Sequence, residues 1–229
     1  PLFFWEIHRY MGGICTADAL RQELDRMVDS QQIELKDACY FKDLNPKWVK
    51  VKQTGVTLAQ KRLVSAKKNA RFISRFPFVE MVAISGALSK NVSKPKDDID
   101  YFIITSHNRL WIARTMLHLF KKITFLVGKQ HDFCMNYFVD TSRLKLDEQN
   151  KFTAIEMASL MPQEGHLLFA ELIRQNDWMC QFVPNAAASV SEITNWRLKK
   201  SKNTLLDWLN RKLMALTNYK WRRKWKRKN

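Results

Sequence analysis

Two aspartates separated by a single residue carry the most specific chemical signal in this chain. Asp98 and Asp100 flank Ile99 at the start of an apolar run, residues 101–104. In a β-strand, side chains at positions i and i+2 point to the same face, so the two carboxylates are expected to converge. Two converging negative charges are unfavourable unless a cation neutralises them or one of them is protonated. The pair therefore predicts a site for Mg²⁺ or Mn²⁺, with Asp98 and Asp100 as metal ligands.

A glycine turn precedes the aspartates by twelve positions. The apolar run from Val79 to Ile84 ends at Ser85-Gly86. Because Gly86 has no Cβ, the backbone there can approach a phosphate closely and donate its amide protons. Hydroxyl and ammonium donors follow nearby, namely Ser85, Ser89, Lys90, Lys94 and Lys96. Each signal alone is weak, but together they predict a strand, a phosphate-binding turn and a second strand with a metal-binding pair. That arrangement is typical of phosphoryl or nucleotidyl transfer.

The surrounding elements predict a sheet covered by helices. An amphipathic helix is expected over 57–76, a helix capped by Asn108 over about 110–122, and a third strand over 133–139. Helices are expected again over 152–160, 167–175 and 205–219, the last with a leucine stripe that packs on the body. The order strand, strand, helix, strand, then helices, predicts an α+β or α/β domain.

The first 45 residues predict a small separate part. A helix over 1–10, a second helix over 17–29 with Thr16 as its N-cap, and a hairpin over 33–41 resemble the layout of a winged helix. A helical cap on a larger domain would look the same. Residues 17–43 contain at least as many acids as bases, which argues against a nucleic-acid recognition helix. Asn45-Pro46 marks the boundary, giving the divisions 1–45, 46–145, 146–219 and a basic tail over 220–229.

Charge is concentrated at the end of the chain. The net charge is +17, and residues 197–229 contain 13 Lys/Arg against a single acid, Asp207. Trp221 and Trp225 lie among these cations, which suits stacking on nucleobases of RNA, or an anionic bilayer surface. A solvated tail is the third interpretation. Four scattered cysteines and the lack of an apolar run of about 20 residues favour a cytoplasmic protein without a transmembrane segment, and no secretory signal is expected.

The central motif resembles the signature of the nucleotidyltransferase superfamily typified by DNA polymerase beta. Ile84–Ala87 matches its hydrophobic-Gly-Gly/Ser turn, and Asp98–Tyr101 matches its Asp-hydrophobic-Asp/Glu-hydrophobic strand. Residues 15–185 are also similar to an uncharacterised prokaryotic group of nucleotidyltransferase-domain proteins. The matching segments are Ser85–Leu88, Asp98–Asp100, Cys134–Phe138, Thr153–Glu156, Asn176–Trp178 and Pro184-Asn185.

The resemblance implies a polymerase-beta-like mixed sheet flanked by helices, and transfer of a nucleoside monophosphate from an NTP to an RNA, protein or small-molecule acceptor. It implies catalytic roles for Asp98, Asp100 and a third ligand, either Asp132 or Asn136. It also implies nucleotide binding by Ser85, Gly86, Ala87, Ser89, Lys90 and Asn136. Ala87 stands where the family has Gly or Ser. The alternative function is a catalytically degenerate module that binds nucleotide or nucleic acid.

Overall fold

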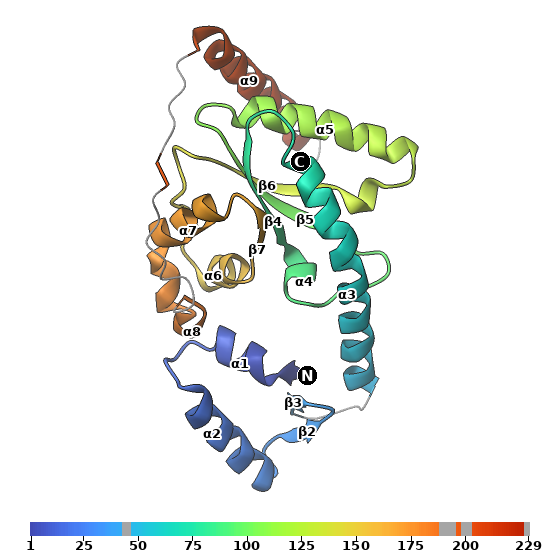
Figure 1. The fold of residues 1–229 in the computed structure, drawn as a ribbon, viewed down its shortest axis with the longest axis vertical. Coiled ribbons are helices and arrows are strands. Elements are labelled where there is room, and N and C mark those ends of the chain that lie inside the picture. Colours follow the sequence, from blue (N-terminus) through green and yellow to red (C-terminus); the bar gives the residue numbers. More distant parts are fainter. Residues whose placement is uncertain (43–46, 188–195, 198–202, 227–229) are drawn as a thin grey trace.

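A four-stranded mixed sheet forms the centre of the protein (Figure 1). The computed structural model describes residues 1–42, 47–187, 196–197 and 203–226. The sheet contains β4 (Val79–Ser85), β5 (Asp100–Thr105), β6 (Cys134–Asp140) and β7 (Met161–Glu164) in the order β6-β5-β4-β7. β5 runs antiparallel to β4 and parallel to β6, and β7 is antiparallel to β4. The α+β class and the mixed sheet are thereby confirmed.

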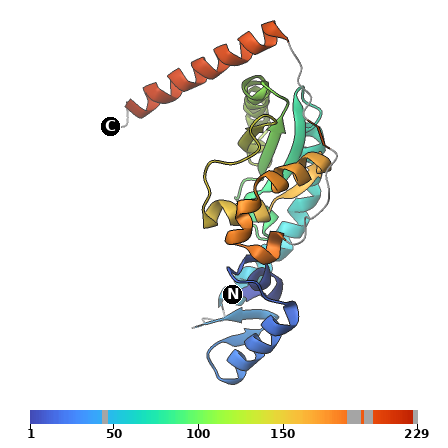
Figure 2. The same ribbon diagram turned by 90° about the vertical axis from the view of Figure 1, so that its left-hand side faces the viewer.

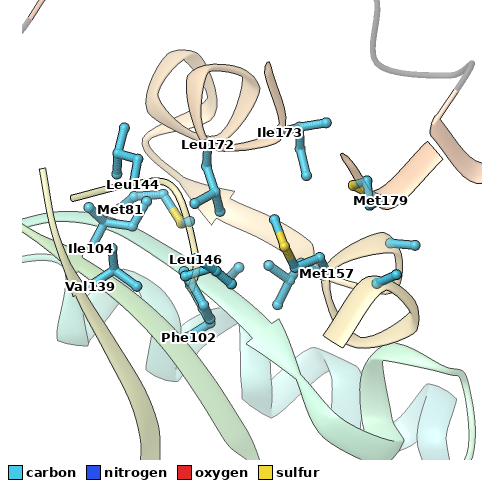
Figure 3. Close-up of a cluster of buried hydrophobic side chains, with 14 of the residues drawn as sticks. Met81, Phe102, Ile104, Val139, Leu144, Leu146, Met157, Leu172, Ile173 and Met179 are labelled. Atoms are coloured by element: carbon cyan, nitrogen blue, oxygen red, sulfur yellow. The ribbon is translucent and has the colours of Figure 1, made fainter. Parts of the chain in front are cut away.

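Helices cover both faces of this sheet because its central strands are apolar on both sides. On one face, α3 (Lys47–Ile73) and α5 (Leu110–Leu126) pack on the alternate residues Val82, Ile84, Tyr101 and Ile103. On the other face lie α6 (Lys151–Ala158), α7 (His166–Gln175) and the 3₁₀ helix η2 (Asp177–Gln181), followed by α8 (Pro184–Ala187). These pack on Met81, Ala83, Phe102 and Ile104 (Figure 3). Alternation along each strand thus gives the sheet one hydrophobic core on each face.

The first 41 residues form a small unit with its own core. It contains β1 (Leu2–Phe3), α1 (Phe4–Tyr10), α2 (Ala17–Asp29), β2 (Glu34–Lys36) and β3 (Cys39–Phe41). The hairpin and the N-cap are confirmed, since Thr16 Oγ1 accepts a hydrogen bond from Ala19 N at 3.2 Å. The expected helix over 1–10 is wrong at its start, because residues 2–3 pair with β3 and complete an antiparallel sheet.

The long helix α3 begins ten residues earlier than expected. The sequence predicted a start at Thr57, after Gly55, but the helix runs from Lys47 through this glycine. Gly55 is buried where residues 92–93 cross the helix: its carbonyl accepts a hydrogen bond from Ser93 N at 3.1 Å, and a Cβ would lie 3.3 Å from Val92 Cγ1. The glycine therefore permits close packing of another segment and does not end the helix.

Tertiary contacts also correct the boundaries of α5. Asn108 was expected to cap this helix, but its φ is +56° and Arg109 is the capping residue, without a side-chain cap bond. The cap comes instead from α9 (Thr204–Lys226), whose Asn210 Oδ1 accepts hydrogen bonds from Trp111 N at 2.9 Å and Ile112 N at 3.3 Å. α5 also continues to Leu126, four residues beyond the predicted end.

The helix α9 projects from the body and does not lie flat on it (Figure 2). Its expected leucine stripe is only partly covered. Leu206, Leu209 and Leu213 are half-buried, whereas Leu205 and Leu216 are 69% and 50% exposed. The prediction that the whole stripe packs on the body is therefore wrong. Within the ranges described, no helix is long and apolar enough to cross a membrane.

Candidate functional site

The turn after β4 touches the carboxylate of Asp100. Gly86 follows the last residue of β4, has φ +69° and begins the short helix α4 (Gly86–Ser89). Ser85 pairs with Asp100 across the sheet, and a Cβ on Gly86 would lie 2.5 Å from Asp100 Oδ2. Both the left-handed backbone and this contact disfavour a side chain at this position. The structure thus brings together the glycine and one aspartate, which are separated by thirteen residues.

The two aspartates lie differently from the simple strand prediction. β5 begins at Asp100, so Asp98 belongs to the preceding loop. Ile99 between them is buried, its N–H donates to the His131 carbonyl at 2.8 Å, and its carbonyl accepts from Cys134 N at 3.0 Å. These bonds fix the backbone between the two aspartates. The side chain of Asp98 is 40% exposed and contacts His131 Nδ1 directly.

Electrostatics couples the pair. Burial raises the pKa of Asp100, a hydrogen bond from Cys134 lowers it, and the negative charge of Asp98 raises it again. Burial also raises the pKa of the Cys134 thiol to about 11, so that this neighbour remains neutral at pH 7. A carboxylate with a raised pKa beside a second carboxylate is the electrostatic situation that a bound cation or a proton relieves. The negative charges of Asp98 and Asp100 therefore oppose each other at this point of the site.

An arginine from α3 holds the loop that leads to Asp98. Arg62 donates to Ser93 Oγ at 2.6 Å, to the Lys94 carbonyl at 3.2 Å and to the Asp97 carbonyl at 2.5 Å. Asp97 Oδ2 accepts from Lys94 N at 2.8 Å and so closes a turn in this loop. Arg62 therefore positions the loop that leads to Asp98.

A cavity of 210 Å³ lies directly beside the glycine turn. Ser85 and Gly86 line it from the turn, Asn136 lines it from β6, and Glu156 lines it from α6. Aromatic groups form the rest of the wall: Phe102 and Tyr137 stack with ring centroids 5.2 Å apart, and Tyr137 remains 47% exposed. Phe152, on the first turn of α6, also lines the cavity and is 72% exposed. Polar groups and exposed rings thus meet at one concave surface next to Asp100.

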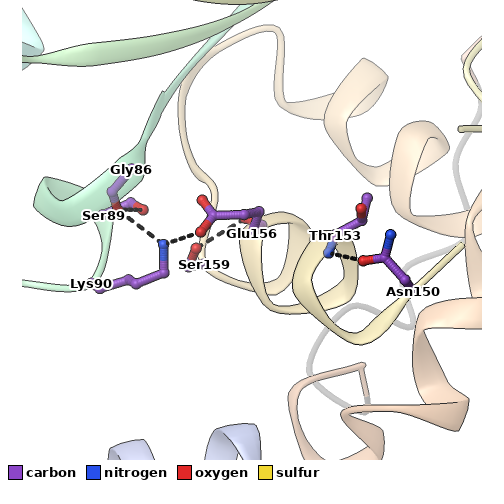
Figure 4. A network of polar contacts seen from close by, with 7 residues as sticks. All are labelled: Gly86, Ser89, Lys90, Asn150, Thr153, Glu156 and Ser159. Carbon is purple, nitrogen blue, oxygen red and sulfur yellow. Dashed lines mark hydrogen bonds and ion pairs between the residues drawn. The ribbon is translucent and has the colours of Figure 1, made fainter. Parts of the chain in front are cut away.

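Lys90 bridges the turn and α6 across the edge of this cavity (Figure 4). Its Nζ donates to the Gly86 carbonyl at 3.2 Å and pairs with Glu156 Oε1 at 2.6 Å. Ser89 Oγ donates to the same carbonyl at 2.9 Å. Two of the residues expected to bind phosphate, Ser89 and Lys90, thus donate to the backbone of the glycine turn. The other three expected residues, Ser85, Gly86 and Ala87, form the turn itself. Glu156 was missed as a site residue, because its distance to Lys90 depends on how α6 packs.

The two candidates for a third ligand lie in different places. Asp132 ends the 3₁₀ helix η1 (Gln130–Asp132), where its carbonyl accepts from Asn69 Nδ2 of α3 at 3.2 Å. Burial raises the pKa of Tyr101, and the negative charge of Asp132 raises it further. The Tyr101 hydroxyl donates to the Ala66 carbonyl of α3, so Asp132 lies on the side of the sheet that α3 covers. Asn136 instead faces the cavity. In the part of the chain that the structure describes, no three His, Cys, Asp or Glu side chains form a group able to hold a metal ion, so Asp132 does not join Asp98 and Asp100.

The remaining histidines lie away from this cluster of groups, with the exception of His131. His118 is on α5, where burial lowers its pKa, and His166 begins α7. His131 contacts Asp98, and its carbonyl accepts a hydrogen bond from Ile99 N. Comparison of the chain with models of protein families, with curated proteins and with solved structures finds no match.

Proposed function

We propose that this chain is a metal-dependent nucleotidyltransferase, which moves a nucleoside monophosphate from an NTP to an acceptor. The observation that carries the proposal is the contact between Gly86 and Asp100. A glycine that is forced into a positive φ beside a half-buried carboxylate brings backbone N–H donors and a metal ligand to one point. The cavity beside them has the mixed lining of a small-molecule site.

The residues around the cavity divide into binding groups. The exposed rings of Tyr137 and Phe152 would stack on the nucleobase, and the Asn136 amide would hydrogen-bond its edge or the ribose. The segment from Ser85 to Lys90 would hold the triphosphate. Lys90 would then exchange its bond to Glu156 for bonds to phosphate oxygens, which are stronger acceptors for a point charge.

Asp98 and Asp100 would hold the cation, Mg²⁺ or Mn²⁺, with phosphate oxygens and water completing the shell. When bound, that ion neutralises phosphate charge and lowers the barrier to attack at the α-phosphorus. In the transfer, an acceptor oxygen forms a bond to the α-phosphorus, the bond between that phosphorus and the α,β-bridging oxygen breaks, and pyrophosphate leaves. The acceptor proton would pass to solvent water, because both carboxylates of the pair hold the cation.

The polymerase-beta-like fold belongs to the same proposal. It is supported by the order of the central elements: β4, the glycine turn, antiparallel β5 with Asp100 at its start, the crossover helix α5, and parallel β6. The small sheet β1-β3-β2 with α1 and α2 supports a winged-helix-like N-terminal part. Its helix α2 carries four acids and two bases, which favours a role in packing or protein contact over nucleic-acid recognition.

The test is transfer of label from α-labelled NTPs, with Mg²⁺ or Mn²⁺, to RNA, protein and small-molecule acceptors. Asp98→Ala and Asp100→Ala should each lower transfer by at least about a hundredfold, whereas Asp132→Ala should leave it near wild type. Asp18→Ala on α2 serves as the matched control for loss of a carboxylate. Equal transfer by the wild type and by both site variants would refute the proposal.

A second candidate is a module that binds nucleotide without turnover. It is favoured by the amide of Asn136 at the position where β6 faces the cavity, and by Ala87, which lacks the hydroxyl of the serine allowed there by the family pattern. This candidate predicts Mn²⁺-dependent binding of a fluorescent ATP analogue, lost in Asp100→Ala, without transfer of label to any acceptor. Binding together with transfer would exclude it.

A further inference from the structure

The helix α9 is anchored to the body by its first half only. Asp207 Oδ1 pairs with Arg109 Nη1 at 2.5 Å, and the Arg109 side chain is 2% exposed. Asn210 caps α5 one turn later. The half-buried residues Leu206, Leu209, Leu213 and Thr217 lie on this same side of the helix. The anchor therefore ends about halfway along α9, at Thr217.

Beyond this anchor the helix is exposed on all sides. Every residue from Asn218 to Trp225 is exposed, and Figure 2 shows this end extending away from the rest of the protein. At 3.6 residues per turn, Met214, Trp221 and Trp225 fall within an arc of about 40°. The cations lie on the rest of the circumference, namely Lys220, Arg222, Arg223 and Lys224. An isolated helix of this kind gains little from propensity alone, so an exposed apolar stripe indicates a partner.

The charge of this segment defines what the partner can be. It carries no acid, so two copies of the segment repel each other and self-association is disfavoured. The partner is consequently anionic. The tryptophans suit either stacked bases or the headgroup region of a bilayer, but the same face of the helix also exposes the aliphatic side chain of Met214, which buries in acyl chains and has no role in base stacking.

The position of α9 also separates it from the nucleotide site. It docks at the start of α5, which follows the far end of β5, whereas Asp100 begins that strand. Six residues of strand place these ends about 17 Å apart before any loop is added. A nucleic-acid acceptor bound on α9 would therefore not be presented to Asp100.

We propose that the segment of α9 from Met214 to Trp225 is a peripheral docking element for an anionic phospholipid bilayer. Its tryptophans and Met214 would lie at the headgroup boundary, and its lysines and arginines would contact the lipid phosphates. The preference for a bilayer over a nucleic acid rests in part on the proposed nucleotide site, whereas the flotation experiment gives its result whether or not that site transfers nucleotides.

The experiment is flotation of the full chain with vesicles of phosphatidylcholine alone and of phosphatidylcholine mixed with phosphatidylglycerol. The chain should float with the mixed vesicles only, release at high salt, and show a blue shift of tryptophan emission. Trp221→Ala/Trp225→Ala should lower the partition coefficient at least about tenfold. Trp48→Ala, which removes a 55% exposed tryptophan on α3, is the matched control and should float normally.

Equal flotation with the two vesicle types, or unchanged flotation of the double variant, would overturn the proposal. A single-stranded RNA oligonucleotide forms the second arm. Tryptophan-dependent binding of this RNA without flotation would likewise overturn it and assign the segment to nucleic acid. Helix content of the double variant, measured by circular dichroism, should match the wild type, because both tryptophans are exposed.

Discussion

Replacing Gly86 with alanine tests two requirements of the glycine turn, a left-handed backbone and an open space beside the Asp100 carboxylate. The residue has φ +69°, and a Cβ there would lie 2.5 Å from Asp100 Oδ2, 3.2 Å from Asp100 Cγ and 3.3 Å from Asp100 Cβ. The left-handed backbone costs an alanine about 1–2 kcal/mol. Rotating the Asp100 carboxylate out of the way costs about 0.5–1.5 kcal/mol more. The expected loss in the free energy of unfolding is therefore about 2 kcal/mol, and the Asp100 carboxylate is displaced.

Two other glycines with positive φ provide matched comparisons. Gly128 has φ +69°, and a Cβ there would meet nothing within 4 Å, so Gly128→Ala should cost only the backbone term, about 1 kcal/mol. Gly165 has φ +76°, and a Cβ there would overlap the Glu80 carbonyl oxygen and lie 2.8 Å from Met81 Cα. Those atoms belong to β4 and cannot move aside, so Gly165→Ala should cost about 3–5 kcal/mol.

Urea unfolding of the three variants measures these costs, and Mn²⁺-dependent binding of a fluorescent ATP analogue measures the site. We expect stability to fall in the order Gly128→Ala, Gly86→Ala, Gly165→Ala. Nucleotide binding should be lost in Gly86→Ala alone, at a temperature where all three variants are folded. Equal stability of the Gly86 and Gly128 variants would refute the steric reasoning. Normal binding by Gly86→Ala would refute the assignment of the turn, without affecting the stability order.

Three further substitutions test the contacts that position the site and α9. Arg62→Ala removes three hydrogen bonds to residues 93–97 and should cost about 2 kcal/mol, with faster amide exchange in that loop, whereas exposed Lys61→Ala should not. Asp207→Ala leaves Arg109 buried without its anion, so it should cost about 2–3 kcal/mol and speed exchange in α9; slow exchange would contradict the anchor. Burial lowers the pKa of His118, so protonation of this imidazole favours the unfolded chain, and the free energy of unfolding should decline as pH falls below about 6.5. His118→Phe should reduce the dependence of the free energy of unfolding on pH in this range. An unchanged dependence would show that His118 does not cause it.

Local chemistry in the sequence predicted much of the central sheet. The apolar runs ending at Ser85 and beginning at Tyr101 became β4 and β5, and the helix between Leu110 and Lys122 became the crossover to β6. These elements were predictable because their periodicity and their turn residues agree. The contact of Gly86 with Asp100 follows from the same information, since the two strands pair in register directly beside the turn.

Features set by packing between distant segments were not predictable in this way. β7 contains Pro162 and no alternation of apolar residues, and it exists because β4 offers an edge on which a proline is tolerated. The cap of α5 comes from Asn210, about a hundred residues away. Glu156 joins the site because α6 packs over the sheet and places its carboxylate beside Lys90. In each case the pairing partner, and not the local sequence, determines the outcome.

The candidates for a third metal ligand show how one extra residue in a strand changes which side chains share a face of the sheet. Counting by twos from Asp132 places Asp132, Cys134 and Asn136 on one face, which made both Asp132 and Asn136 candidates, the first for its charge and the second for its central position. Asp132 lies before the strand, in η1, and is held against α3. Between Met135 and Tyr137 the register with β5 shifts, so Asn136 is an extra residue, and both it and Tyr137 line the cavity. Such a bulge turns consecutive side chains to one face. It therefore places an amide and an aromatic ring, and no carboxylate, on the cavity wall that β6 contributes.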